Sequence, residues 1–125
     1  MIVREIRGVP HVVDSCFYQV KATSQVTVTV DIGSFQAGGT SYSWRGQRVL
    51  GQPNFTDHPV NGPGQPISGT TMHCLTKVTD MRDDTNQTSV TYTLKGGVRE
   101  RSYPYGIEAP EDGMVNYQVT FVFTE

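Results

Sequence analysis

The sequence predicts an all-β protein, a single-domain antiparallel β-sandwich or barrel with a long glycine- and proline-rich loop or arm. Helix periodicity is nearly absent, because glycine or proline interrupts most windows that could form a helix. Strict alternation of apolar and polar residues, which is typical of strands buried on one face, recurs along the chain. The length of 125 residues suits one domain with its own core, so residues 1–125 are expected to form a single unit.

Three segments alternate most clearly, at residues 25–32, 89–94 and 115–123. In each segment, apolar side chains, mostly β-branched or aromatic, occupy one face of the expected strand and polar side chains occupy the other, except that Val122 breaks the alternation near the end of the last segment. The residues expected to face the core are Val26, Val28, Val30, Ile32, Val90, Tyr92, Leu94, Val115, Tyr117, Val119, Phe121 and Phe123.

A less regular strand is expected at 72–78, where Met72, Cys74 and Val78 oppose His73, Leu75 and Lys77. The polar stretch 80–86 is rich in turn-forming residues, so the strands before and after it are expected to form a β-hairpin. Further strands are expected at 16–22 and 41–45, and a first strand pair at 2–6 and 9–13.

The stretch from Gly33 to Gly69 has a different character, since it holds most of the glycines and four of the seven prolines of the chain. Prolines at this density do not suit a central sheet, because each lacks the amide donor of the ladder. Large apolar residues nevertheless punctuate the stretch, which disordered linkers rarely show. We expect a short strand pair around Trp44 and Val49, followed by an extended arm whose apolar side chains are buried on a neighbouring subunit.

Aromatic residues add to this expected interface, because tyrosine and tryptophan combine a large apolar area with a polar tip. Two readings stay open beside it: a flat aromatic platform for a sugar ring, built on Trp44 and nearby tyrosines, and ordinary core packing. The interface hypothesis comprises Phe35, Tyr42, Trp44, Leu50, Phe55, Val60, Ile67, Tyr103 and Tyr105.

Charge and hydropathy argue against two kinds of partner. Charged residues make up 18% of the chain, the formal net charge is −2 and the basic residues are scattered, so no specific nucleic-acid binding is expected. The apolar runs are far shorter than the roughly 20 residues that span a bilayer. Residues 1–7 carry charges without an apolar run, so we expect no signal peptide and synthesis in a host cytoplasm.

No catalytic or metal-binding motif is recognisable, so no enzyme activity, metal or cofactor is expected. Adjacent His73 and Cys74 would point to opposite faces of a strand, and no ligand pair has the spacing of a structural zinc site. Asp80, Asp83, Asp84 and Asn86 lack the spacing of a calcium-binding loop and are interpreted as turn residues. Cys16 and Cys74 are interpreted as buried thiols rather than a disulfide.

The last quarter of the chain resembles the closing segment of contractile-phage tail tube proteins. In that family a Tyr-Pro turn leads through an apolar residue to a final alternating strand, as Tyr103-Pro104, Ile107 and residues 119–123 do here. The resemblance covers about a fifth of the chain, and the chain departs from the family because tube subunits usually carry a helix. An all-β subunit with glycine- and proline-rich arms is equally similar to the small decoration or head-closure proteins of phage capsids.

These resemblances imply a structural subunit of a tailed-phage virion, either a tail tube subunit or a capsid decoration or head-closure protein. Its expected partners are copies of itself and other virion proteins, and assembly would use β edges and the extended arm. The first alternative is a monomeric carbohydrate-binding module that uses Trp44 and nearby tyrosines. A small hydrolase that uses Cys16 or Cys74 with His11 or His58 is a third hypothesis.

Overall fold

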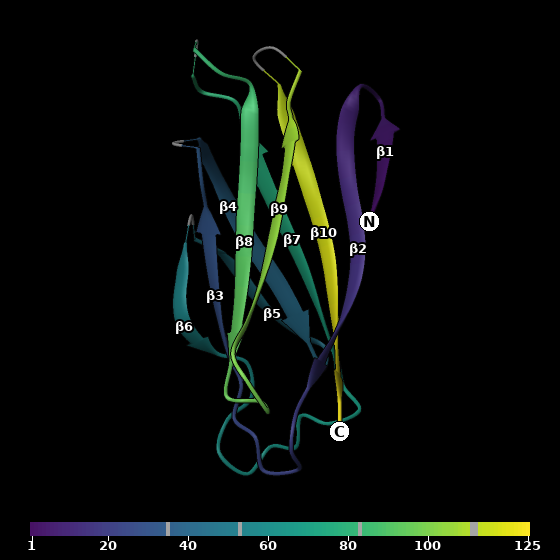
Figure 1. The fold of residues 1–125 in the computed structure, drawn as a ribbon, viewed down its shortest axis with the longest axis vertical. Helices are drawn as coiled ribbons and strands as arrows, with labels where there is room; N and C mark the ends of the chain where they lie inside the picture. Colours follow the sequence, from purple (N-terminus) through teal and green to yellow (C-terminus); the bar gives the residue numbers. More distant parts are fainter. Residues whose placement is uncertain (35, 53, 83, 111–112) are drawn as a thin grey trace.

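The computed structural model describes residues 1–34, 36–52, 54–82, 84–110 and 113–125, with the backbone alone at 50–52. These residues form β-strands joined by turns and loops, and none of them is helical (Figure 1). The strands are β1 (Ile2–Ile6), β2 (Val9–Gln19), β3 (Thr27–Ile32), β4 (Ala37–Trp44), β5 (Gln47–Gln52), β6 (Phe55–Pro59), β7 (Thr71–Thr79), β8 (Gln87–Lys95), β9 (Arg101–Glu108) and β10 (Met114–Thr124).

The strands form two sheets packed face to face, so the predicted all-β class is confirmed as a sandwich rather than a closed barrel. The larger sheet has the order β1-β2-β10-β7-β4-β5, and the smaller sheet has the order β6-β3-β8-β9. Neighbouring strands run antiparallel except β2 and β10, which pair in parallel from His11–Asn116 to Gln19–Thr124. Figure 1 shows the smaller sheet lying across one face of the larger sheet, with β1 and β2 to one side of it.

The alternating segments form the strands that their patterns predict, because their apolar faces meet between the sheets. Val28 and Val30 of β3 and Val90, Tyr92 and Leu94 of β8 are fully buried. Along β10, Val115, Tyr117, Val119, Phe121 and Phe123 are buried in the same way. Each large side chain contributes about 1.5–3 kcal/mol when it is fully buried, so these strands supply much of the stability of the core.

The predicted hairpin between β7 and β8 is wrong, although both strands exist. β7 pairs with β10 and β4 in the larger sheet, whereas β8 pairs with β3 and β9 in the smaller sheet. The connection therefore crosses from one layer to the other instead of turning back within one sheet. Buried Asp80 holds this crossing, because its Oδ1 accepts a hydrogen bond from Gln36 Nε2 (3.1 Å) and another from the backbone amide of Arg82 (3.2 Å).

The segment from Gly33 to Gly69 also differs from its prediction. The expected strand pair is present, since Tyr42 lies opposite Val49 in the β4–β5 ladder, but no extended arm follows it in the described residues. Residues 55–59 instead form β6, which pairs with β3 in the smaller sheet. The loop after β6 folds back on the core, where Ile67 is fully buried and Val60 is 8% exposed.

Asn61 fixes that loop in place although it is a polar residue with 3% exposure. Its side-chain nitrogen donates to the backbone oxygens of Ser24 (3.0 Å) and Gln65 (2.7 Å). Its side-chain oxygen accepts a hydrogen bond from the backbone amide of Val26 (2.8 Å). Because each of these polar groups has a partner, the loop can bury Asn61 next to Val60 and Ile67, while residues 63–66 remain exposed.

Candidate functional site

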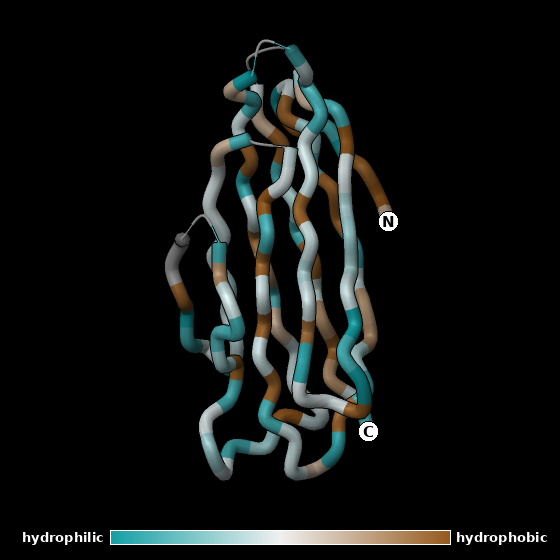
Figure 2. The backbone as a smooth tube through the Cα atoms, turned by 60° about the vertical axis from the view of Figure 1, so that its left-hand side comes forward, coloured by the Kyte–Doolittle hydropathy of each residue, from teal (hydrophilic) through white to brown (hydrophobic). Residues whose placement is uncertain are grey.

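The first strand, β1, combines a free sheet edge with exposed apolar side chains, as strands at protein interfaces do. β1 is an edge strand of the larger sheet and pairs with β2 alone. All five of its residues are exposed, including Ile2 (54%), Val3 (51%) and Ile6 (51%). The tube in Figure 2 shows this hydrophobic stretch next to the N-terminus, on the outside of the molecule.

The turn between β1 and β2 determines which backbone groups of β1 face solvent. Arg7 and Gly8 both have positive φ angles, 52° and 80°, as a two-residue type I′ hairpin turn requires. The pair that closes such a turn, Ile6 and Val9, exchanges hydrogen bonds, and bonded and non-bonded pairs then alternate along the ladder. The amide and carbonyl groups of Val3 and Glu5 therefore point away from β2, toward the free side of the sheet.

The exposure of β1 follows from where the second layer ends. β9 is the edge strand of the smaller sheet, and its side chains Tyr103 and Tyr105 contact β2. The Tyr105 hydroxyl donates to Asp14 Oδ2 (2.7 Å), and the Tyr103 hydroxyl donates to the backbone oxygen of Phe17 (3.4 Å). In the part of the chain that the structure describes, β1 pairs with β2 alone and all five of its residues are exposed, so its apolar side chains lie in solvent on both faces of the strand.

The other three edge strands carry features that discourage pairing with another chain. β9 contains Pro104, which lacks an amide donor. β6 ends in Pro59 and contains Asp57 in the left-handed region (φ 45°), and its ladder with β3 shifts register. The β5 ladder is also irregular, since its register shifts between Thr40 and Tyr42. β1 has none of these features, and its register with β2 is unbroken over five pairs.

A further exposed aromatic residue lies on the same side of the larger sheet as the outward side chains of β1. Phe17 of β2 is 68% exposed and lies opposite Val122 of β10. A single exposed apolar side chain is common on protein surfaces, whereas apolar side chains that gather on one side of a molecule mark contact sites. With Ile2, Val3 and Ile6 of β1, Phe17 places four exposed large apolar side chains on the β1–β2 hairpin.

Most of the residues that the sequence predicted at an interface lie in the core of the chain. Phe35 and the side chain of Leu50 lie outside the described residues. Tyr103 is half-buried, with its ring centroid 5.1 Å from that of Phe121. For the six remaining residues, the prediction that a neighbouring subunit buries them is wrong. The chain buries them in its own core: Tyr42, Trp44, Phe55, Val60, Ile67 and Tyr105.

The burial of Trp44 also removes the expected aromatic platform. Its side chain is 4% exposed, and its indole nitrogen donates to Thr70 Oγ1 (2.8 Å). The guanidinium of Arg45 lies 5.5 Å from the centre of its ring. A sugar ring therefore has no open face of Trp44 on which to stack.

The two cysteines lie in settings that disfavour a thiolate. Cys74 is buried in the core, and burial raises the pKa of its thiol. Burial also raises the pKa of Cys16, whose Sγ lies 3.1 Å from the Tyr105 hydroxyl and 3.7 Å from Asp14 Oδ2. Because the thiolate is the nucleophile, neither residue is activated. A disulfide is out of reach, since β10 lies between the two strands and spaces them about 9–10 Å apart.

The histidines do not complete a catalytic or metal site with these thiols. His73 is exposed while Cys74 is buried, so the two adjacent residues face opposite sides of β7 as predicted. His11 faces the outer side of the larger sheet and Cys16 the inner side. His58 packs against the rings of Tyr42 and Phe55. Among the described residues, no group of three or more His, Cys, Asp or Glu side chains is arranged to hold a metal ion.

The acidic turn residues are also engaged within the chain. Asp80 is held by Gln36, as described above, and the Asp84 carboxylate accepts two hydrogen bonds from the Arg82 guanidinium (2.8 and 2.6 Å). Asp83 lies outside the described residues. The described part of this loop therefore behaves as a structured turn.

Comparison with known proteins gives no further constraint. No protein-family model, curated protein or solved structure matches the chain. Within the described residues, no helix has the length and apolar character needed to cross a bilayer. The free edge of β1 is therefore the feature on which a functional hypothesis rests.

Proposed function

We propose that this chain is a non-enzymatic structural subunit that assembles with copies of itself through the free edge of β1. The observation that carries the proposal is that β1 has both exposed apolar side chains and unpaired backbone groups. Three apolar side chains are about half exposed on a regular edge strand, and the backbone groups of Val3 and Glu5 point outward.

Strand addition would satisfy both features of this edge at once. A neighbouring strand would pair with the outward amides and carbonyls and would cover part of the apolar surface of Ile2, Val3 and Ile6. The charged side chains Arg4 and Glu5 would then select the register, because like charges directly opposite each other destabilise a strand pair. An unprotected edge is otherwise an aggregation liability, which is the physical reason for expecting a specific partner.

The setting that we propose for this assembly is the virion of a tailed phage. The support is the resemblance of Tyr103-Pro104, Ile107 and residues 119–123 to the closing segment of tail tube proteins, and the similarity to small capsid decoration and head-closure proteins. Other virion proteins would be further partners, and synthesis would take place in the host cytoplasm. The alternative of a carbohydrate-binding module has less support, because it depended on an accessible Trp44.

A pair of substitutions at Val3 tests the proposal. Val3→Pro removes an outward amide that the β1–β2 ladder does not use, so the hairpin is kept while strand addition is blocked. Val3→Thr is the matched control, since it keeps the amide and a β-branched side chain. Light scattering behind a sizing column should show a concentration-dependent mass increase for the wild type and Val3→Thr, and a monomer for Val3→Pro. A wild type that stays monomeric at every concentration, or a Val3→Pro variant that assembles normally, would overturn the proposal.

A further inference from the structure

The outer face of the larger sheet, which points away from the smaller sheet, has an unusual distribution of charge. Residues paired across neighbouring strands share a face, so the ladders define rows of outward side chains. One row runs through Ser15, Thr120, His73, Ser43 and Arg48, and a second through Val13, Gln118, Leu75 and Ser41. A third row contains Arg4, His11, Asn116 and Lys77.

No aspartate or glutamate faces outward from the strands of this sheet in the described part of the chain. The two acidic residues that β1 and β2 contain, Glu5 and Asp14, lie on the opposite face, in line with buried Val12 and Val119. The chain as a whole has a net charge of −2, so its acidic residues are concentrated elsewhere. The outer face therefore carries arginine, lysine and histidine without a carboxylate to neutralise them.

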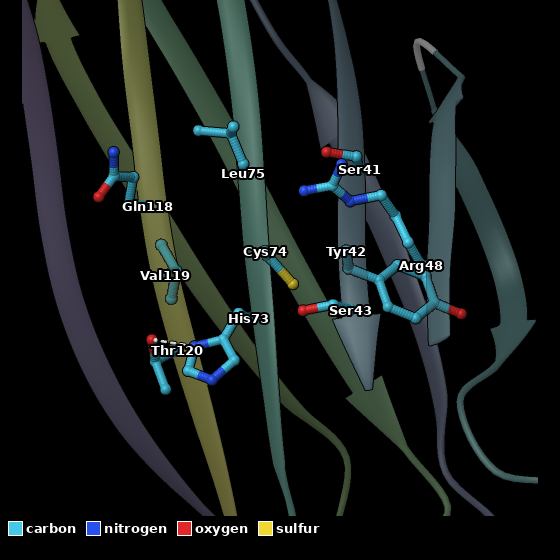
Figure 3. Close-up of a pocket in the computed structure, with 10 residues that line it drawn as sticks. All are labelled: Ser41, Tyr42, Ser43, Arg48, His73, Cys74, Leu75, Gln118, Val119 and Thr120. Atoms are coloured by element: carbon cyan, nitrogen blue, oxygen red, sulfur yellow. Dashed lines mark hydrogen bonds between the residues drawn. The ribbon is translucent and has the colours of Figure 1, made fainter. Parts of the chain in front are cut away.

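A pocket of about 240 Å³ lies near the middle of this face, over β10, β7, β4 and β5. Its polar lining comes from Ser41, Ser43, Arg48, His73, Gln118 and Thr120, with Leu75 at its side. Figure 3 shows the Arg48 side chain running from the edge strand over β4, so that its guanidinium lies beside Ser41. The hydroxyl of Ser43 and the ring of His73 lie on the same side of the sheet.

The main hydrogen-bond donors of this pocket, on Arg48 and His73, are available to a ligand. Arg48 has no ion-pair or hydrogen-bond partner among the described residues. The Nδ1 atom of His73 lies 3.2 Å from Thr120 Oγ1, which orients the ring, and its Nε2 atom has no hydrogen-bond partner among the residues that the structure describes. Arginine donates in a planar fork that matches the oxygens of carboxylate and phosphate groups.

We propose that this pocket binds an oxyanion group, a carboxylate or a phosphate, with Arg48 as the principal ligand. Ser41, Ser43 and the His73 ring would donate further hydrogen bonds from β4 and β7. The absence of carboxylates on this face favours an anionic ligand over a cationic one, and the single guanidinium sets the charge that it can neutralise. The oxyanion has two possible sources, a free anion or an acidic side chain of a second copy of the chain. The site uses no group on the free edge of β1, so it stands apart from the proposed function.

Backbone amide chemical shifts of residues 41–43, 73–75 and 118–120 test this site and separate the two sources. In the first arm, inorganic phosphate is titrated at constant ionic strength with chloride as the compensating anion. In the second arm, the wild-type protein alone is concentrated. Saturable shifts with phosphate indicate a free anion, and shifts with concentration that phosphate suppresses indicate a carboxylate of another copy; either supports the proposal.

Substitution of the guanidinium provides the decisive comparison. Arg48→Gln should raise the dissociation constant about tenfold or more, because a charge-assisted hydrogen bond is lost. Arg101→Gln is the matched control, since it removes the same charge from an exposed residue of β9 and should leave binding unchanged. Both positions are exposed, so both variants should fold. The proposal is overturned if neither arm shifts these amides, or if the shifts persist in Arg48→Gln.

Discussion

Val3 and Val12 lie directly opposite each other across the β1–β2 ladder, yet Val12 is fully buried and Val3 is 51% exposed. The two side chains lie on the same face of the larger sheet. The smaller sheet covers Val12 but does not reach Val3. β2 is the last strand that the smaller sheet covers. β1 therefore extends the larger sheet beyond its own core, which makes it the part of the chain best placed to meet another.

The first prediction concerns the loop that Asn61 fixes. Asn61→Ala removes three hydrogen bonds and leaves the buried amide of Val26 without a partner, so the free energy of unfolding should fall by about 3 kcal/mol. Asn54→Ala is the control, since the Asn54 side chain accepts one exposed hydrogen bond from the backbone of Ile32. Urea denaturation measures both variants. Equal, small losses would show that the loop does not depend on Asn61.

A second prediction concerns pH and the Tyr105–Asp14 hydrogen bond. Burial raises the pKa of Asp14, but the hydrogen bond from Tyr105 and others outweigh it, so the pKa lies below its ordinary value. The stabilisation is therefore present above the unfolded pKa of about 4 and is lost as the pH falls through the lower, folded value. Tyr105→Phe should cost about 1 kcal/mol at neutral pH and progressively less below pH 4.

The control for this prediction is Tyr103→Phe, because the Tyr103 hydroxyl bonds a backbone oxygen rather than a carboxylate. Its effect on the free energy of unfolding should not vary over the same pH range. Chemical denaturation at a series of pH values gives both profiles. A loss in Tyr105→Phe that is independent of pH would contradict the assignment of Asp14 as the responsible group.

The third prediction concerns the turn after β8. Gly96 has a φ angle of 94°, and a Cβ atom at this position would lie 1.9 Å from the backbone oxygen of Gln25. Gly96→Ala should therefore destabilise the protein by about 3 kcal/mol or more, since the clash is with backbone. Gly64→Ala is the matched control: its φ angle is 75°, but open space surrounds the position, so only the conformational cost of about 1 kcal/mol applies. Similar losses in the two variants would contradict the packing of this turn.

The sequence was sufficient to predict the strands whose two faces differ in environment. Val28 and Val30, or Tyr117 and Val119, alternate with polar residues because one side meets the core and the other meets solvent. Strand partners were not predictable in the same way. Alternation records which face is buried but not which layer a strand joins, so β7 and β8 were wrongly expected to pair with each other.

The functional surface was the least predictable part. Apolar residues between glycines and prolines were expected to require a neighbour, but β6 and the Asn61 hydrogen bonds bury Phe55, Val60 and Ile67 within the chain. The exposed apolar residues of β1 could be recognised in the sequence only as apolar residues on both faces of a short strand. Whether such a strand is covered depends on the extent of the second layer, which no local pattern records.

Amide hydrogen exchange at β1 tests the central claim most directly, because it reports on the outward backbone groups themselves. In dilute protein, the amides of Val3 and Glu5 should exchange rapidly, while those of Arg4 and Ile6, which pair with β2, should be protected. At concentrations where the mass increases, the Val3 and Glu5 amides should become protected as well. If they exchange equally fast in the dilute and the concentrated protein, β1 is not the assembly edge.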